Sequence, residues 1–176
     1  MEKSIKSSAL NYGLYLGLGL TLLTVIIYAV NLDVFVKWWF GIGLFVIIVI
    51  IGYMSAVKSK KIQGGLISFK DAFTSFFITI LVGTLISSIV SFVIFNLVDP
   101  EAAKDLNEKI LIATKESMER FGAPEESIKE QLSKLQEKDN FAIGTQLTNY
   151  IIGLVVYSIF GLIGAAIIKK KNPNQD

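Results

Sequence analysis

Charged residues are absent from four long stretches of this chain. All 32 of them lie outside the windows 7–32, 38–57, 72–98 and 140–168, which hold 26, 20, 27 and 29 residues. A helix needs about 20 mostly apolar residues to cross the roughly 30 Å hydrocarbon core of a bilayer. Transmembrane β-strands would instead need alternating segments of about 10 residues, and these stretches do not alternate. The pattern therefore predicts an all-α, polytopic membrane protein with four transmembrane helices.

The ends of these windows carry signals of helix boundaries. Trp38 and Trp39 stand at the start of the second window, where an amphipathic indole prefers the lipid headgroup region. Ser68 is predicted to cap the third helix by accepting a hydrogen bond from a first-turn N–H group, while Asp71 bonds back to the N–H of Ser68. We expect one membrane domain over residues 1–176, with transmembrane helices at about 9–30, 38–57, 72–98 and 147–168.

Residues 99–139 form a polar segment between the last two windows. Gly122 suits the end of one helix, and Pro124 suits the first turn of the next. We therefore predict an extramembrane helical hairpin, with amphipathic helices at about 101–121 and 124–138. Its apolar stripes, at the three- and four-residue spacing of a helix face, are Leu106, Ile110, Ile128, Leu132 and Leu135.

Charge is distributed unequally between the two predicted sides of the membrane. The N-terminus, residues 58–71 and the C-terminal tail together hold nine Lys and three acidic residues, whereas 33–37 and 99–139 hold eight Lys or Arg and twelve acidic residues. Lysines also abut helix ends at 58–61 and 169–171. Dense Lys and Arg at helix ends mark the cytoplasmic side. We expect a multi-pass protein of the cell inner (cytoplasmic) membrane, with both termini cytoplasmic and the insert 99–139 outside.

Small residues recur in the predicted spans at four-residue spacing, which permits close approach of helix backbones. The most polar residues inside the windows are Asn96, Gln146 and Asn149, which either line a small cavity or meet headgroups and neighbouring helices. A Lys cluster after the second span either binds anionic lipid headgroups or only sets the topology. The candidate packing residues are Gly13, Gly17, Gly83, Ser87, Ser91, Gly161 and Ala165, and the candidate lipid contacts are Lys58, Lys60 and Lys61.

The sequence contains neither histidine nor cysteine. This removes Ser-His-Asp and Cys-His catalysis, His-ligated metal sites and disulfides. The acidic residues of 99–139 are interspersed with Lys and lack the spacing of a calcium-binding loop. A net charge of +2 gives no argument for nucleic-acid binding. We therefore expect no enzyme activity, no cofactor, no metal and no nucleic-acid partner.

A nine-residue stretch leads into the third window. Residues 65–73 read Gly-Leu-Ile-Ser-Phe-Lys-Asp-Ala-Phe; a Lys-bearing N-terminus and a helix pair precede them, and a charged helical insert, a last helix and a Lys-rich tail follow. With this layout the chain resembles, over nearly its full length, the bacterial domain-of-unknown-function family 4199, small integral membrane proteins found mainly in Bacteroidota. The resemblance implies the fold and the source class, and it implies no activity.

Three functional classes follow from these observations. The leading hypothesis is a non-enzymatic structural or accessory membrane protein, embedded in the lipid bilayer, whose insert contacts another protein or the membrane surface. The alternative is a small transporter or channel subunit that acts as a homo-oligomer. The absence of ionisable residues from the windows counts against ion coupling, although hydroxyls of the third helix can line a neutral pore: Thr84, Ser87, Ser88 and Ser91. A membrane enzyme using Ser/Lys or Asp/Glu groups at an interface is the third class.

Overall fold

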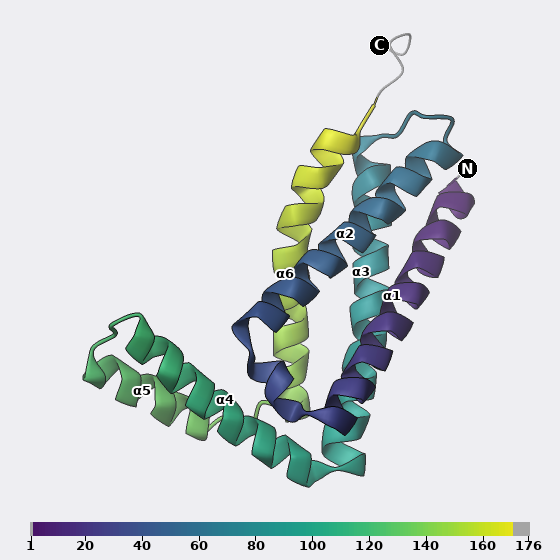
Figure 1. Cartoon of the computed structure of the whole chain (residues 1–176). Coiled ribbons are helices and arrows are strands. Elements are labelled where there is room, and N and C mark those ends of the chain that lie inside the picture. Colours follow the sequence, from purple (N-terminus) through teal and green to yellow (C-terminus); the bar gives the residue numbers. More distant parts are fainter. Residues whose placement is uncertain (1, 171–176) are drawn as a thin grey trace.

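Helices account for most of the computed structural model, which describes residues 2–170; residue 1 and residues 171–176, including Lys171 of the tail, lie outside the described part. Four long helices run side by side as a bundle (Figure 1): α1 (Glu2–Val30), α2 (Trp38–Ile62), α3 (Phe69–Val93) and α6 (Ile143–Ile168). Between α3 and α6 the chain forms α4 (Pro100–Arg120) and α5 (Glu125–Gln136). A 3-10 helix, η1 (Leu32–Val36), joins α1 to α2, and a π-helical turn, η2 (Ile94–Val98), extends α3.

The four long helices have the length and apolarity needed to cross a membrane. This confirms the prediction of an all-helical, multi-pass architecture. Two helices extend beyond the charge-free windows, since α1 includes Lys6 and α2 continues through Lys61, whereas α6 stays inside its window but begins at Ile143 rather than at the predicted 147. The difference has a simple cause: a bilayer excludes charged side chains, whereas a helix that continues into the aqueous layer accepts them.

Helix α3 lies at the centre of the bundle and contacts α1, α2 and α6. Its contact with α1 is the most extensive, and glycines of both helices face the partner helix. A Cβ added at Gly17 would lie 2.8 Å from Ile86, and one added at Gly83 would lie 2.6 Å from Leu16. Gly13 is similarly close to α3, with an added Cβ 2.9 Å from Val82. Any larger residue at these positions would therefore force the two backbones apart.

Glycines also make room for an aromatic ring between α2 and α6. The side chain of Phe76 on α3 is 1% exposed. An added Cβ would lie 2.7 Å from this ring at Gly52 of α2 and 2.6 Å from it at Gly161 of α6. One turn further along α6, Gly164 makes room for the ring of Tyr53, which donates a hydrogen bond to the carbonyl of Phe160 at 2.8 Å. Phe76 is therefore enclosed by three helices.

One end of the bundle is tied together by backbone hydrogen bonds. The start of α1, the turn from α2 to α3 and the end of α6 gather there (Figure 1). The N–H of Ile67 donates to the carbonyl of Lys170 at 3.0 Å, and the N–H of Lys170 donates to the carbonyl of Ile67 at 2.9 Å. Lys60 Nζ donates to the carbonyl of Ile168 at 2.8 Å and so caps α6. The last helix is thereby fixed to the loop before α3.

Ser68 begins α3 at this same end. Its hydroxyl oxygen accepts a hydrogen bond from the N–H of Asp71 at 3.0 Å. The predicted return bond from the Asp71 carboxylate to the N–H of Ser68 is not formed among the described residues. That carboxylate instead accepts a hydrogen bond from Gln63 Nε2 at 3.1 Å. The difference arises because Gly64 and Gly65, at φ +73° and +89°, fold the chain so tightly that the end of α2 lies beside the start of α3.

Candidate functional site

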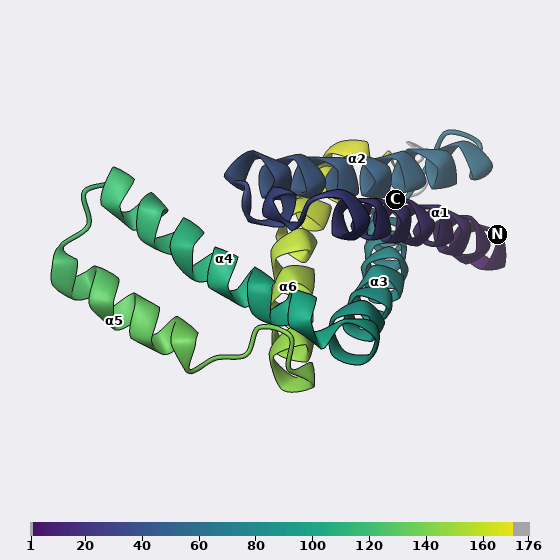
Figure 2. The ribbon, with the colours of Figure 1, turned by 60° about the horizontal axis from the view of Figure 1, so that its bottom comes forward.

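Helices α4 and α5 form a hairpin, which we call the arm (residues 100–136). The arm lies across the opposite end of the bundle and projects beyond α6 (Figures 1 and 2). Gly122, at φ +71°, ends α4 and allows the chain to reverse. On α5 only Ile128 is buried, at 8% exposure, whereas Phe121 at the tip is 87% exposed.

The arm is anchored where it leaves α3. The carboxylate of Asp99 caps α4 by accepting from the N–H of Ala102 at 3.0 Å, and it also accepts from the hydroxyl of Tyr28 at 2.9 Å. These two bonds, that from Ala102 foremost, hold the pKa of Asp99 below its usual range. Leu106, 4% exposed, packs in a cluster that contains Phe95. The first two turns of α4 are therefore fixed to the bundle.

A groove of about 400 Å³ separates the next part of α4 from the start of α2; we call it the arm groove. Its apolar wall includes Trp38, Trp39 and Ile112, whose side chains are 70%, 54% and 58% exposed. An ion pair between Lys109 Nζ and Asp33 Oδ1, at 2.6 Å, crosses it. That pair lowers the pKa of Asp33 and raises that of Lys109. The groove thus combines exposed aromatic surface with charges of both signs.

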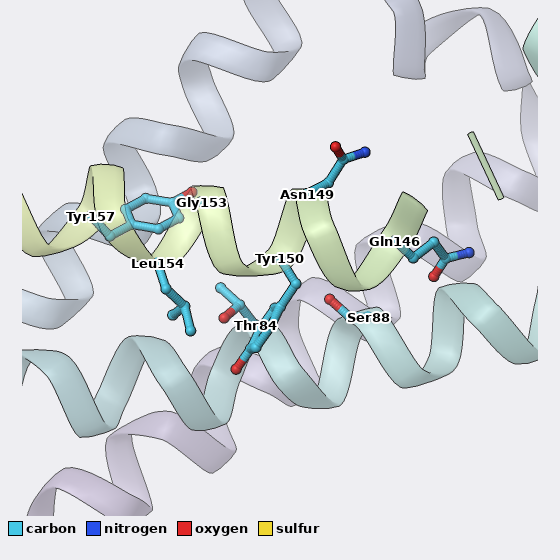
Figure 3. Close-up of a pocket in the computed structure, with 8 residues that line it drawn as sticks. All are labelled: Thr84, Ser88, Gln146, Asn149, Tyr150, Gly153, Leu154 and Tyr157. Atoms are coloured by element: carbon cyan, nitrogen blue, oxygen red, sulfur yellow. The ribbon is translucent and has the colours of Figure 1, made fainter. Parts of the chain in front are cut away.

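A second feature lies within the bundle. The α3–α6 cavity has a volume of about 360 Å³, and Figure 3 draws the residues that line it. Tyr150 extends from α6 toward α3 and donates to the carbonyl of Leu81 at 2.9 Å. Thr84 donates to the carbonyl of Ile80 at 2.7 Å. The lining residues are all uncharged: Thr84, Ser88, Gln146, Asn149, Tyr150, Gly153, Leu154 and Tyr157.

Several polar groups of this cavity retain hydrogen-bonding capacity. Gln146 uses its Nε2 group to donate to the carbonyl of Phe141 at 3.0 Å, which leaves its amide oxygen available. Within residues 2–170, neither the hydroxyl of Ser88 nor the amide of Asn149 has a protein partner. Asn96 lies elsewhere and donates to the carbonyl of Phe92 at 3.2 Å. Of the three polar residues noted in the sequence, the fold therefore places two in this cavity.

A smaller, mostly apolar cavity of about 200 Å³ adjoins the first one, and we call it the apolar cavity. Thr84 and Ser88 line both cavities, and Ser87 lines the apolar one. Ser91, a half-buried residue one turn further along α3, lines neither. The remaining lining residues, contributed by α1, η1 and α2, are Leu20, Leu23, Thr24, Phe35, Phe40, Leu44 and Ile48.

Four hydroxyl-bearing side chains form a fully buried cluster that the sequence reasoning missed. Ser55 and Ser59 on α2 face Ser75 and Thr79 on α3, and each of the four is 0% exposed. The oxygens of Ser59 and Ser75 lie 2.8 Å apart, as do those of Ser55 and Thr79. Thr79 Oγ1 is also 3.1 Å from the carbonyl of Ala9 on α1. The signal was available as a serine or threonine pair at four-residue spacing on each of two helices.

The candidate lipid-binding lysines are not equivalent in the fold. Lys58 and Lys61 are exposed and line a surface groove of about 370 Å³ together with Tyr12 and Tyr53. Lys60 is half-buried and caps α6 instead. Ala165, a candidate packing residue, is 2% exposed in a cluster with Ile67 and Ala72.

The comparisons with known proteins identify a family and nothing closer. The family model described as "Protein of unknown function (DUF4199)" matches residues 11–170. No curated protein and no solved structure matches the chain. The matched range spans the arm as well as the bundle.

Proposed function

The chain belongs to the DUF4199 family of proteins of unknown function, and we propose that it is a non-enzymatic accessory protein of the membrane whose arm contacts a partner membrane protein. The chemistry of the chain supports a role without catalysis, because histidine and cysteine are absent from the sequence. The four charge-free windows supply no acid or base within the membrane. The arm is the feature that needs a functional explanation.

The arm groove is the observation that carries this proposal. Trp38, Trp39 and Ile112 leave aromatic and aliphatic surface exposed beside the Lys109–Asp33 ion pair. Protein interfaces are enriched in tryptophan and arginine, with an apolar centre and a polar rim. A bilayer surface fits less well, because residues 99–139 hold eleven acidic and seven basic residues and an excess of acid is repelled by anionic headgroups.

The proposal includes an orientation. We place both termini in the cytoplasm and the arm outside, as an extramembrane hairpin at the surface of the inner (cytoplasmic) membrane. The Lys residues at the tied end of the bundle support this orientation by the positive-inside rule. Trp38 and Trp39 place the start of α2 at the opposite headgroup layer, because indoles prefer the interface. The partner then meets the arm groove at that layer.

Photo-crosslinking in living cells tests the proposal. A photoreactive amino acid at Ile112, in the arm groove, is expected to give one discrete adduct with a different membrane protein. The same residue at Gln131, exposed on α5 and outside the groove, serves as the matched control. If the adducts contain only lipid, the arm contacts the membrane surface and not a partner protein. Equal adducts from both positions would contradict a specific groove.

The α3–α6 cavity favours a second candidate, a small transporter or channel subunit that works as a homo-oligomer. Its lining is uncharged and includes hydroxyl and amide groups, which suits an uncharged solute rather than an ion. Purified protein in liposomes would then release a trapped neutral solute faster than empty liposomes do. Self-adducts from Ile112 together with such a flux would favour this candidate over the accessory role.

A further inference from the structure

The α3–α6 cavity and the apolar cavity together have the polarity of an amphiphile. The first includes hydroxyl and amide groups beside apolar ones, the second is lined largely by Leu, Ile and Phe, and they share Thr84 and Ser88. No charged side chain lines either one. A volume of about 360 Å³ lies within the range of roughly 300–1,000 Å³ found for small-molecule sites.

The position of the cavities in the bundle restricts which molecules reach them. All residues of the α3–α6 cavity belong to two candidate membrane spans, Phe69–Val98 and Ile143–Ile168. Neither cavity is enclosed by the protein. The stacked rings of Phe45 and Tyr157, with centroids 5.2 Å apart, join α2 to α6 beside the cavity. A ligand in this place therefore enters from the lipid phase rather than from water.

The hydrogen-bonding groups without a protein partner indicate which polar groups the head of the ligand carries. The hydroxyl of Ser88, the amide oxygen of Gln146 and the amide of Asn149 have capacity left, as described above. A polar group left unsatisfied at membrane depth is costly, so hydroxyls in such helices usually bond to a carbonyl four residues earlier. Thr84 makes that bond to Ile80, whereas Ser88 makes none in the described chain. These groups complement a head that offers hydroxyl and carbonyl groups and no charge.

We propose that this protein binds one uncharged lipid of the diacylglycerol type between α3 and α6. The glycerol hydroxyl and an ester carbonyl bond to Ser88, Gln146 and Asn149, and one acyl chain lies along Phe40 and Leu44 of the apolar cavity. A charged headgroup is excluded, because no residue of either cavity carries a counter-charge. The inference does not depend on the arm or its partner.

The test uses photolabelling of the purified full-length protein in lipid nanodiscs. The probe is dioleoylglycerol with a diazirine in one acyl chain, and labelled peptides are mapped by mass spectrometry. Labelling is expected to saturate and to map to α3, α6 and the start of α2. Unlabelled dioleoylglycerol should compete, whereas dioleoylphosphatidic acid, with identical chains and an anionic head, should compete about tenfold less well, as the loss of a matched polar contact predicts.

Two glycines of α6 provide a matched pair of variants. Gly153 lines the cavity and Gly144 does not, and an added Cβ at either position meets no atom within 4 Å. Gly153→Leu therefore fills the cavity without moving the backbone, and it should abolish saturable labelling. Gly144→Leu should label as the unmodified protein does. Thermal unfolding of both variants checks that each is folded.

Three results would overturn the proposal. Labelling that does not saturate would mean that the probe only samples surrounding lipid. Equal competition by phosphatidic acid would show that the site does not recognise the neutral headgroup. Equal labelling of the Gly153→Leu and Gly144→Leu variants would place the binding somewhere other than this cavity.

Discussion

At the scale of single residues, the buried hydroxyl cluster explains how α1, α2 and α3 are held in one arrangement. Apolar packing alone is weakly specific inside a bilayer, because lipid chains are as apolar as leucine side chains. A hydroxyl left unsatisfied there costs free energy. The pairs Ser59–Ser75 and Ser55–Thr79 satisfy one another at 2.8 Å only in one register of α2 against α3.

Thr79 is the member that joins three helices. Thr79→Val keeps the shape of the side chain and removes its bonds to Ser55 and Ala9. We expect the free energy of unfolding to fall by about 1 kcal/mol, the usual size of a buried hydrogen bond between membrane helices. Thr148→Val is the control, because Thr148 is exposed and bonds only to the carbonyl of Gly144. Reversible unfolding in mixed micelles measures both, and equal losses would refute the role of the cluster.

Close approach of the helix backbones also stabilises the bundle, and it depends on single glycines. Gly83→Ala places a Cβ 2.6 Å from the side chain of Leu16, and we expect a destabilisation of about 1–3 kcal/mol from overpacking. Gly153→Ala adds the same methyl group where no atom lies within 4 Å. It should leave the unfolding midpoint in detergent unchanged or raise it slightly, since alanine favours the helix. A similar loss in both variants would show that α1 and α3 tolerate a wider separation.

At the scale of elements, the arm depends on packing for its order. Isolated helices as short as α5 are marginal in water, and α5 buries only Ile128. Ile128→Ser should therefore unfold α5, because burial of one large aliphatic side chain stabilises by about 1.5–3 kcal/mol. Hydrogen exchange over residues 125–136 is expected to become fast. Gln131→Ser, at an exposed position of the same helix, should preserve slow exchange.

The ion pair at the arm groove makes the arm sensitive to acid. Lys109 lowers the pKa of Asp33 below its ordinary value of 3.8, so the stabilisation is present above that value and is lost as the pH falls through the lowered pKa. The raised pKa of Lys109 sets the upper limit of the pH range in which the ion pair stabilises the arm. The stabilisation is fully present below 10.5, the ordinary pKa of lysine, and is lost as the pH rises through the raised pKa of Lys109. The contact therefore persists through the neutral range and fails in strong acid.

Tryptophan fluorescence can follow this transition, because both tryptophans of the chain line the arm groove. A change in emission is expected only below about pH 4. In Asp33→Asn the emission should already differ at neutral pH and should lack this acid step. Asp105→Asn is the control, because Asp105 lies 3.7 Å from Lys109 and is the weaker partner. If the acid-induced change in emission persists in Asp33→Asn, a group other than Asp33 causes it.

The elements were predictable from sequence to the extent that their signals are local. Charge-free windows, the Ser68 cap and the Gly122 turn each act within a few residues, and the helices and the hairpin follow from them. The cavities and the hydroxyl cluster depend on how each helix is rotated and tilted against α3, which no local pattern encodes. For this reason Ser87 and Ser91, one turn apart on the same face, differ in that only Ser87 lines the apolar cavity.

At the scale of the whole molecule, the two ends of the bundle differ in composition. The tied end gathers Lys60, Lys61 and the end of α6, while the other end carries the arm, which holds eight acidic and six basic residues (Figure 1). Reporter domains inserted after Gly64 or fused after the C-terminus should behave as cytoplasmic, and one inserted at Gly122 should behave as external. A cytoplasmic signal at Gly122 would reverse the orientation and leave the four spans unchanged.

The central position of α3 has a consequence for biosynthesis. Chains emerge from the ribosome N-terminus first, and every hydroxyl of the buried cluster lies before residue 80. The first three helices can therefore assemble while the arm is still being translated. Helix α6 is synthesised after the arm, and the paired backbone hydrogen bonds between Ile67 and Lys170 fix its end to the loop before α3. A nascent chain that stops before α6 contains the complete hydroxyl cluster but only the α3 wall of the α3–α6 cavity, so the cavity forms after the cluster.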